Sequence, residues 1–275
     1  MQTQNKNKPL SYPAAPPDSQ PTPLLQALPP ITANTALFLD FDGTLVEIAA
    51  QPEDVQIPPN LLATLAALHD RLGGALALVS GRRLSDIDGF LTPLRFPAAA
   101  EHGAQRRGAD QQLSSFPAPC LQQARLAAEG LLVRHPGLRL EQKHLALTLH
   151  YRHAPELEGL CLQVMRAAVE RSVGLDLMQG KCVLDVRPSG VSKGTAIAAF
   201  MSEAPFAGRL PVFAGDDTTD EDGFEQVQRL GGHAIKVGGG PSVARHRCDS
   251  VTALAAWLQL PLAVQPDARA EKVQA

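Results

Sequence analysis

Three short apolar runs each end in polar residues, and this layout restricts the fold more than any other feature of the sequence. The runs cover residues 36–39, 75–79 and 211–214, and the polar clusters that follow them are Asp40-Phe41-Asp42, Ser80-Gly81-Arg82 and Gly215-Asp216-Asp217. Runs of this kind are typical of strands that are buried on both faces of a parallel sheet. Because the carboxyl ends of parallel strands meet at one edge of the sheet, the sequence predicts an α/β fold with these polar residues together at its ligand-binding edge.

The segment between residues 106 and 185 has a different pattern. Residues 121–133 and 156–173 are predicted as helices, and residues 145–151 and 181–186 as strands, without the polar cluster that follows each core strand. We therefore predict a parallel-sheet core made of residues 31–105 and 186–260. An inserted α+β cap, residues 106–185, is expected to lie over the ligand-binding edge.

Both ends of the chain differ in composition from the part between them. Residues 1–30 carry eight prolines, at positions 9, 13, 16, 17, 21, 23, 29 and 30. Because proline lacks an amide donor and restricts its neighbour to extended geometry, we predict a disordered lead-in over residues 1–30. Residues 261–275 are expected to form an unanchored tail.

Composition argues against several classes of function. Of the 275 residues, 44% are hydrophobic and 19% charged, as in ordinary globular domains. The net charge of −3 and the 4% aromatic content argue against a nucleic-acid partner. The sequence has no apolar run of about twenty residues and no basic-then-apolar start, so we expect no membrane span, no secretory signal and a cytoplasmic location. We expect a monomer with reduced cysteines that acts on a small molecule.

Asp40 and Asp42 stand directly after the first apolar run. Asp and Gly are common in solvated turns, which is the simpler explanation of this segment. Two like charges that end an apolar strand are costly, however, and this favours a chemical role. Gly43 permits a tight turn, and Thr44 offers a hydroxyl and an amide to an anion.

A second acidic cluster, with Asp216, Asp217 and Asp220, follows the third run. Acidic residues in the first turn of a helix favour its dipole, which explains Asp220 without any chemistry. It does not explain the two aspartates at the tip of an apolar strand. Carboxylates that converge at one sheet edge indicate a cation, and hard oxygen ligands suit Mg²⁺.

Lys193 and Ser80 complete the candidate set. Lys193 stands just before a helix predicted to run to about Met201, and a single exposed lysine would be unremarkable there. Beside an acidic site that binds a phosphate dianion, it would neutralise an oxygen and orient a nucleophile. Ser80 would donate to a phosphate oxygen, while Gly81 lets the backbone approach it.

These segments, in this order, resemble the haloacid dehalogenase-like (HAD) phosphohydrolases, whose pattern is DxDGT, SGR, SKG and GDDxTDE. The resemblance narrows to the family of trehalose-6-phosphate phosphatases, of bacterial type, over about residues 36–260. The further residues that carry it are Glu101-His102-Gly103, Glu141, Lys143, His150-Tyr151-Arg152, Gly180-Lys181 and Arg187-Pro188.

The resemblance implies a Rossmann-like core with a C2-type cap that hydrolyses trehalose 6-phosphate with Mg²⁺. Asp40 would be the nucleophile and Asp42 the general acid/base, while Ser80 and Lys193 would bind the phosphate. The resemblance places Mg²⁺ at the Asp40 carboxylate, the Asp42 main-chain carbonyl and Asp216, supported by Asp217 and Asp220.

The resemblance also implies where substrate binds. The expected contacts are Gly81, Arg82, Glu101 and His102 in the core, and Glu141, Lys143 and Asp185 in the cap. Asp185 occupies a position where the family usually has glutamate, so its reach is about one methylene shorter.

Two alternatives stay open on the sequence. Another sugar phosphate, such as sucrose 6-phosphate, could be the substrate of the same kind of enzyme, since only cap residues separate the two. A catalytically silent sugar-phosphate-binding protein would be expected to lack one of Asp40, Asp42, Lys193 or Asp216, and all four are present.

Overall fold

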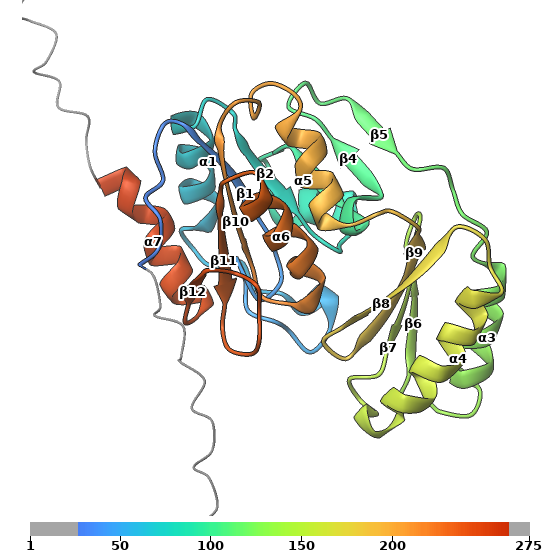
Figure 1. The fold of residues 1–275 in the computed structure, drawn as a ribbon. Coiled ribbons are helices and arrows are strands. Elements are labelled where there is room, and N and C mark those ends of the chain that lie inside the picture. Colours follow the sequence, from blue (N-terminus) through green and yellow to red (C-terminus); the bar gives the residue numbers. More distant parts are fainter. Residues whose placement is uncertain (1–26, 264–275) are drawn as a thin grey trace, which may run out of the picture.

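The computed structural model describes residues 27–263, which form a large and a small sheet, each with its own helices (Figure 1). The large sheet has eight strands. In spatial order these are β12 (His246–Cys248), β11 (His233–Val237), β10 (Leu210–Gly215), β1 (Thr35–Leu39), β2 (Leu76–Val79), β3 (Ala98–Ala100), β4 (Gln105–Arg107) and β5 (Leu113–Ser115). The pairs from β12 to β3 are parallel, and β4 and β5 continue the sheet as antiparallel strands. The predicted α/β fold with a mainly parallel sheet is confirmed.

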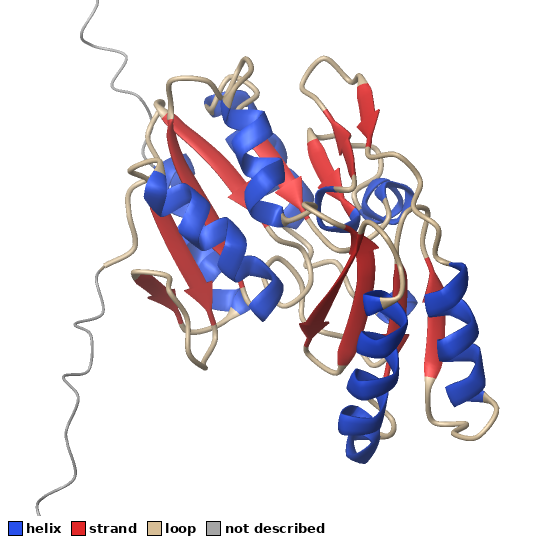
Figure 2. Cartoon of the chain, turned by 45° about the vertical axis from the view of Figure 1, so that its right-hand side comes forward, coloured by secondary structure: helices blue, strands red, loops and turns tan. Residues whose placement is uncertain are grey.

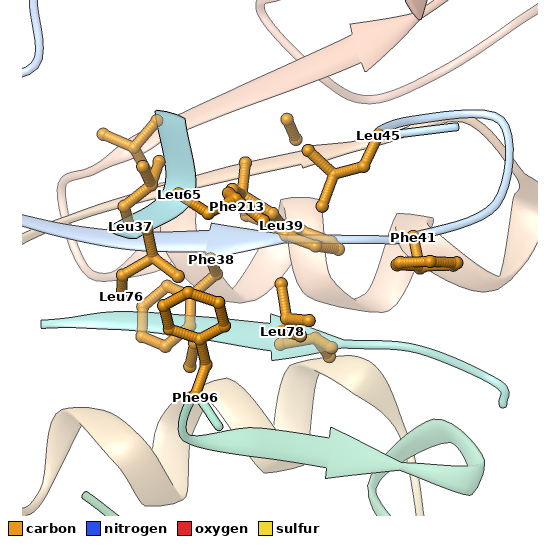
Figure 3. Packing of buried hydrophobic residues seen from close by; sticks show 14 of the residues in the cluster. Leu37, Phe38, Leu39, Phe41, Leu45, Leu65, Leu76, Leu78, Phe96 and Phe213 are labelled. Atoms are coloured by element: carbon orange, nitrogen blue, oxygen red, sulfur yellow. The ribbon is translucent and has the colours of Figure 1, made fainter. Parts of the chain in front are cut away.

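The central strand β1 explains why the core forms. All five of its residues are buried, because β10 and β2 flank it and helices cover both faces of the sheet. Figure 3 shows Leu37, Phe38 and Leu39 of β1 beside Leu76 and Leu78 of β2 and Phe213 of β10. A strand buried on both faces is apolar at every position rather than at every second one.

The helices of the core form two layers (Figure 1). Helices α1 (Leu61–Arg71) and α7 (Val251–Ala263) contact each other on one face, and α5 (Lys193–Met201) and α6 (Glu221–Arg229) on the other. The remaining core helices are α2 (Leu84–Phe90) and the short 3-10 turns η1 (Pro52–Asp54), η2 (Glu101–Gly103) and η4 (Thr218–Asp220).

The small sheet belongs to the cap and is antiparallel throughout. Its order is β6 (Arg139–Gln142), β7 (Leu147–His150), β9 (Val183–Pro188) and β8 (Leu175–Gly180). Helices α3 (Gln122–Leu132) and α4 (Glu158–Glu170), with the turn η3 (Pro155–Leu157), cover the face that points away from the core (Figure 2). Successive strand residues face opposite sides, so Leu147, Leu149 and Leu184 pack under these helices. The alternate residues face the core.

The change from core to cap lies farther along the chain than the domain boundaries predicted from the sequence. Strand β4 begins at Gln105 and leads into β5, so the core sheet extends past residue 106. Strand β9 continues beyond residue 185 to Pro188. The sequence signal failed there because β4 and β5 are short and polar.

The predicted lead-in lies outside the described residues except for 27–30, where the Pro29 carbonyl accepts a hydrogen bond from the Trp257 indole at 2.9 Å. The predicted tail also lies outside them, except for the last turn of α7. Among residues 27–263, no helix is long and apolar enough to cross a membrane.

Candidate active site

The carboxyl edge of the parallel sheet gathers the residues that follow its strands. Leu39 of β1 is in register with Leu78 of β2 and Ala214 of β10, so Asp40, Ser80 and Asp216 emerge next to one another. They line one pocket, which is also lined by Glu141, Thr148 and Asp185 of the cap sheet. The predicted convergence of the strand ends is therefore present in the structure.

Lys193 contacts two buried carboxylates at the base of the pocket. Its ammonium donates to Asp40 Oδ1 at 2.7 Å and to Asp220 Oδ1 at 2.6 Å. Lys193 is the first residue of α5, and Ser192 caps this helix by accepting a hydrogen bond from the Thr195 amide. Burial lowers the pKa of Lys193, but the carboxylates of Asp220 and Asp40 outweigh burial and raise it. The lysine is therefore a fixed cation.

Asp40, Asp216 and Asp220 form an acidic cluster. One carboxylate oxygen from each lies within 4.8 Å of the others. Burial and the neighbouring carboxylates of Asp220 and Asp216 raise the pKa of Asp40, against the pull of Lys193. Burial, then the charge of Asp220, raises the pKa of Asp216 to about 7. One lysine does not neutralise three carboxylates, so the cluster fits a divalent cation with oxygen ligands.

The carboxylates of the three residues differ in how many hydrogen bonds they already accept, and therefore in how well they could bind a metal. Asp220 is saturated, because its second oxygen accepts the amides of Asp216 and Asp217 at 3.0 and 2.9 Å. Asp40 Oδ2 accepts from the Thr44 hydroxyl at 3.2 Å. The Asp216 carboxylate accepts no hydrogen bond within the described part of the chain. It lies so close to Gly43 that a side chain at position 43 would collide with it. Asp216 and Asp40 are the members best able to take a cation, with Asp220 fixing the loop around them.

Asp42 lies apart from this cluster. Both of its oxygens accept from Arg82, from Nε and from Nη2, each at 2.7 Å. The guanidinium is held in turn over the rings of Phe41 and Phe90, at 5.5 and 4.8 Å from their centroids. Arg82, predicted as a substrate contact, therefore has Asp42 as its partner here.

His102 lies over the loop that follows β2. A Cβ on Gly81 would come within 2.6 Å of His102 Nε2, so only glycine leaves space for the ring. Burial lowers the pKa of His102, although Asp185 at 3.3 Å opposes that effect. Within residues 27–263, neither ring nitrogen has a well-aligned hydrogen-bond partner. Ser80 and His102 both line the pocket.

The cap contributes the predicted sugar-binding residues, and each is paired with another side chain of the pocket. Glu141 lies 3.0 Å from His150 Nε2, and Asp185 lies 3.6 Å from the Lys143 ammonium. Thr148 also donates to Asp185. Burial would raise the pKa of Asp185, but Lys143 and His102 outweigh it and hold the pKa well below its usual range.

Two predicted site residues are engaged elsewhere. Glu101, predicted to bind substrate, is buried and accepts the amides of His144 and Leu145 with its two oxygens. Asp217, predicted among the metal residues, accepts the amides of Lys181 and Thr218 and is not part of the acidic cluster. Both carboxylates therefore satisfy backbone donors, which the sequence pattern did not distinguish from ligand contacts.

Several contacts of the site were not anticipated. Lys236 donates to the main-chain carbonyl of Asp216, and a lysine inside an otherwise apolar run was a signal that could have indicated it. At the mouth of the pocket, Arg152 of the cap donates to the Ala49 carbonyl at 2.5 Å, and Arg139 donates to Gln51. Arg152 belongs to the His150-Tyr151-Arg152 segment that carries the resemblance, but its partner, 103 residues away, could not be predicted from it. No local pattern marks Arg139, whose partner lies 88 residues away.

Known proteins resemble this chain in sequence and in architecture. The chain is 42% identical to the trehalose-6-phosphate phosphatase of Escherichia coli over 238 residues, which cover 86% of this chain and 90% of the relative. Among solved structures, the C-terminal domain of the Candida albicans trehalose-6-phosphate phosphatase covers 85% of this chain and 93% of its own, with a TM-score of 0.76 at 21% identity.

A phosphatase of the HAD superfamily from Bacteroides thetaiotaomicron matches 84% of this chain and 95% of its own, with a TM-score of 0.59 at 17% identity. These two likenesses show that the chain shares the fold of both structures. The model of one family, described as trehalose-phosphatase, matches residues 38–253. On the sequence and the fold together, the chain belongs to the trehalose-phosphatase family.

Proposed function

We propose that the chain hydrolyses trehalose 6-phosphate to trehalose and inorganic phosphate, with Asp40 as the nucleophile. The observation that carries the proposal is the arrangement around Asp40. Its carboxylate lies at the base of a pocket, 2.7 Å from the buried ammonium of Lys193 and within the acidic cluster. A carboxylate in this setting suits attack on phosphorus better than a purely structural role.

In the first step, Asp40 attacks the phosphorus, and the bond from phosphorus to the sugar oxygen breaks. The departing sugar alkoxide takes a proton from Asp42. In the second step, water attacks the phosphorus of the aspartyl phosphate and gives its proton to Asp42. Phosphate leaves and Asp40 is regenerated. Proton transfer at the leaving oxygen is worth about 10²–10⁴-fold for a poor leaving group.

The phosphate would contact Lys193, the Ser80 hydroxyl and the backbone at Gly81. The amino-terminal end of α5 lies beside Asp40, because Lys193 is its first residue. A helix amino terminus favours bound anions, so the α5 dipole supports the same site. Arg82 would act on substrate through Asp42, which accepts hydrogen bonds from its Nε and Nη2.

Mg²⁺ is the proposed metal, with Asp40 and Asp216 as its side-chain ligands, the backbone at Asp42 nearby, and Asp217 and Asp220 as supporting residues. Bound there, Mg²⁺ supplies positive charge to an anionic substrate and to the carboxylates around it. The fit rests on the donor set, which consists of oxygens close enough to share one ion.

The sugar would occupy the space between the cap and the core. Lys143, Glu141 and His102 line the pocket and offer donors and acceptors to hydroxyl groups. Asp185 is proposed to act on the sugar with Lys143, whose ammonium it accompanies. Sites that hydrogen-bond a hydroxyl reject analogues that leave their polar groups unpaired.

A phosphate-release screen tests the function. The arms are trehalose 6-phosphate, sucrose 6-phosphate, glucose 6-phosphate and p-nitrophenyl phosphate, each with Mg²⁺ and after chelation with EDTA. We expect trehalose 6-phosphate to give the highest kcat/KM, and chelation to abolish release from every substrate. Asp40→Asn should abolish turnover with the fold retained. A preference for sucrose 6-phosphate, or release that persists in EDTA or in Asp40→Asn, contradicts the proposal.

A further inference from the structure

Glu101 is a buried carboxylate of the core whose two oxygens both bind backbone amides of the cap. Oε1 accepts from the His144 amide at 2.9 Å, and Oε2 accepts from the Leu145 amide at 2.7 Å. The residue is 1% exposed. Charge-assisted bonds of this kind are the strong ones in proteins. Glu101 is not among the residues that line the pocket, so its carboxylate faces the cap turn rather than a sugar.

The two amides belong to the turn that carries Lys143. This turn joins β6 to β7 and is closed by the Lys143 amide, which donates to the Ala146 carbonyl at 2.9 Å. Leu145 packs against Ala104 and Val191, which are core residues. The two residues that follow Lys143 are therefore fixed to the core, and the backbone of Lys143 is fixed with them.

The η2 turn, which contains Glu101 and His102, is also bound to the loop on the phosphate side of the pocket. The Glu101 amide donates to the Arg82 carbonyl at 2.8 Å, and the His102 amide donates to the Ser80 carbonyl at 2.9 Å. Glu101 and His102 also have positive φ angles, 47° and 60°, which non-glycine residues adopt only when their surroundings require it. Strained backbone thus connects the loop after β2 with the turn of the cap.

We propose that Glu101 is a positioning residue that sets the distance between the phosphate site and the sugar-binding Lys143, by holding the turn at residues 143–146 against the core. This inference rests on the proposed function for its catalytic readout. Misplacing a binding group by about 1 Å costs roughly 10²-fold in rate. Loss of the two hydrogen bonds between Glu101 and the turn, called here the tether, should therefore lower kcat/KM for trehalose 6-phosphate.

The test compares Glu101→Gln with Glu129→Gln, a control that removes the same charge from an exposed position on α3. In Glu101→Gln, an NH₂ group replaces one acceptor and faces a backbone N–H. We expect hydrogen exchange at the His144 and Leu145 amides of the ligand-free protein to accelerate at least 10-fold. We also expect kcat/KM for trehalose 6-phosphate to fall roughly 10- to 100-fold, and that for p-nitrophenyl phosphate less than about 3-fold. Glu129→Gln should change none of these.

The outcomes separate the two proposals. A loss on the sugar ester with unchanged amide exchange means that Glu101 touches the sugar itself, and it overturns the positioning role. Equal losses on both esters also overturn it. If the wild-type chain does not hydrolyse trehalose 6-phosphate, the proposed function fails, while the exchange measurement still tests the tether. Should Glu101→Gln not fold, Glu101→Asp, with a shorter reach and the same charge, is expected to change both readouts in the same direction by smaller factors.

Discussion

Replacing Lys193 by methionine removes the cation between two buried carboxylates and tests how the site is held together. The Lys193 ammonium lies 2.7 Å from Asp40 and 2.6 Å from Asp220, and the exposed fractions of the three side chains are 3%, 5% and 0%. Methionine has nearly the same length and shape, so the change leaves little cavity. What remains is two like charges away from water, with Asp216 beside them.

The expected cost follows from this burial. Removing one partner of a buried ion pair destabilises a protein by about 3–5 kcal/mol, because the other charge stays buried and uncompensated. For a domain of this size, 1 kcal/mol corresponds to about 2–4 °C in Tm, so we expect a fall of about 6–20 °C in the metal-free protein. A divalent cation binds the folded chain and should restore part of the loss, while turnover stays abolished.

The assay is thermal and urea unfolding of the wild type and the variant, each in EDTA and in excess Mg²⁺. Lys181→Met is the matched control, since Lys181 is exposed on the cap and a surface substitution changes stability by at most about 0.5 kcal/mol. A Tm for Lys193→Met within about 2 °C of that of the control would refute the expected destabilisation. A larger fall in Tm in Mg²⁺ than in EDTA would refute the expected rescue by the cation.

Four further predictions concern other residues. The pKa of Asp216 is raised from 3.8 to about 7, so between these values the folded chain keeps a proton that the unfolded chain has released. Metal-free stability should therefore fall as pH rises from about 4 to about 7, and urea titrations of Asp216→Asn should show a flatter profile. Gly81→Ala places a methyl group 2.6 Å from the His102 ring and should lower kcat/KM on the sugar ester at least 10-fold, measured by phosphate release. Gly89→Ala, which meets no atom within 4 Å in α2, should instead stabilise the fold by about 0.5–1 kcal/mol, measured by urea unfolding. Lys143→Ala should reduce kcat/KM for trehalose 6-phosphate far more than for p-nitrophenyl phosphate, and equal losses would show that the cap does not bind the sugar.

The sequence was sufficient to predict the strands that carry the site. β1, β2 and β10 are buried on both faces except at Leu210 and are almost wholly apolar, and α5 begins at a Ser192 cap. Strand β3 was missed because it consists of three alanines, a residue with weak strand preference. The strength of the signal thus follows from how much apolar surface each strand buries.

Side-chain partners were much harder to predict than strand ends. Arg82 and Asp42 are 40 residues apart, and Glu101 and His144 are 43 apart. Such pairs depend on how the loop after β2, the η2 bend and the cap turn pack against one another. The sequence marks a polar residue as important but does not say whether it meets a ligand, a metal or a backbone amide.

Asp40 and Asp42 show how the fold separates two carboxylates that are only two residues apart. In a continued strand they would share one face, but the chain turns at Gly43, whose φ is 76°, and Asp42 pairs with Val46 in a short bridge. Asp40 then faces Lys193 inside the acidic cluster, while Asp42 is one-third exposed and faces Arg82. A nucleophile and a proton carrier need different surroundings, and here different cations hold the two groups. The proposed roles of Asp40 as nucleophile and Asp42 as proton carrier therefore depend on Lys193 and Arg82 as much as on the two aspartates themselves.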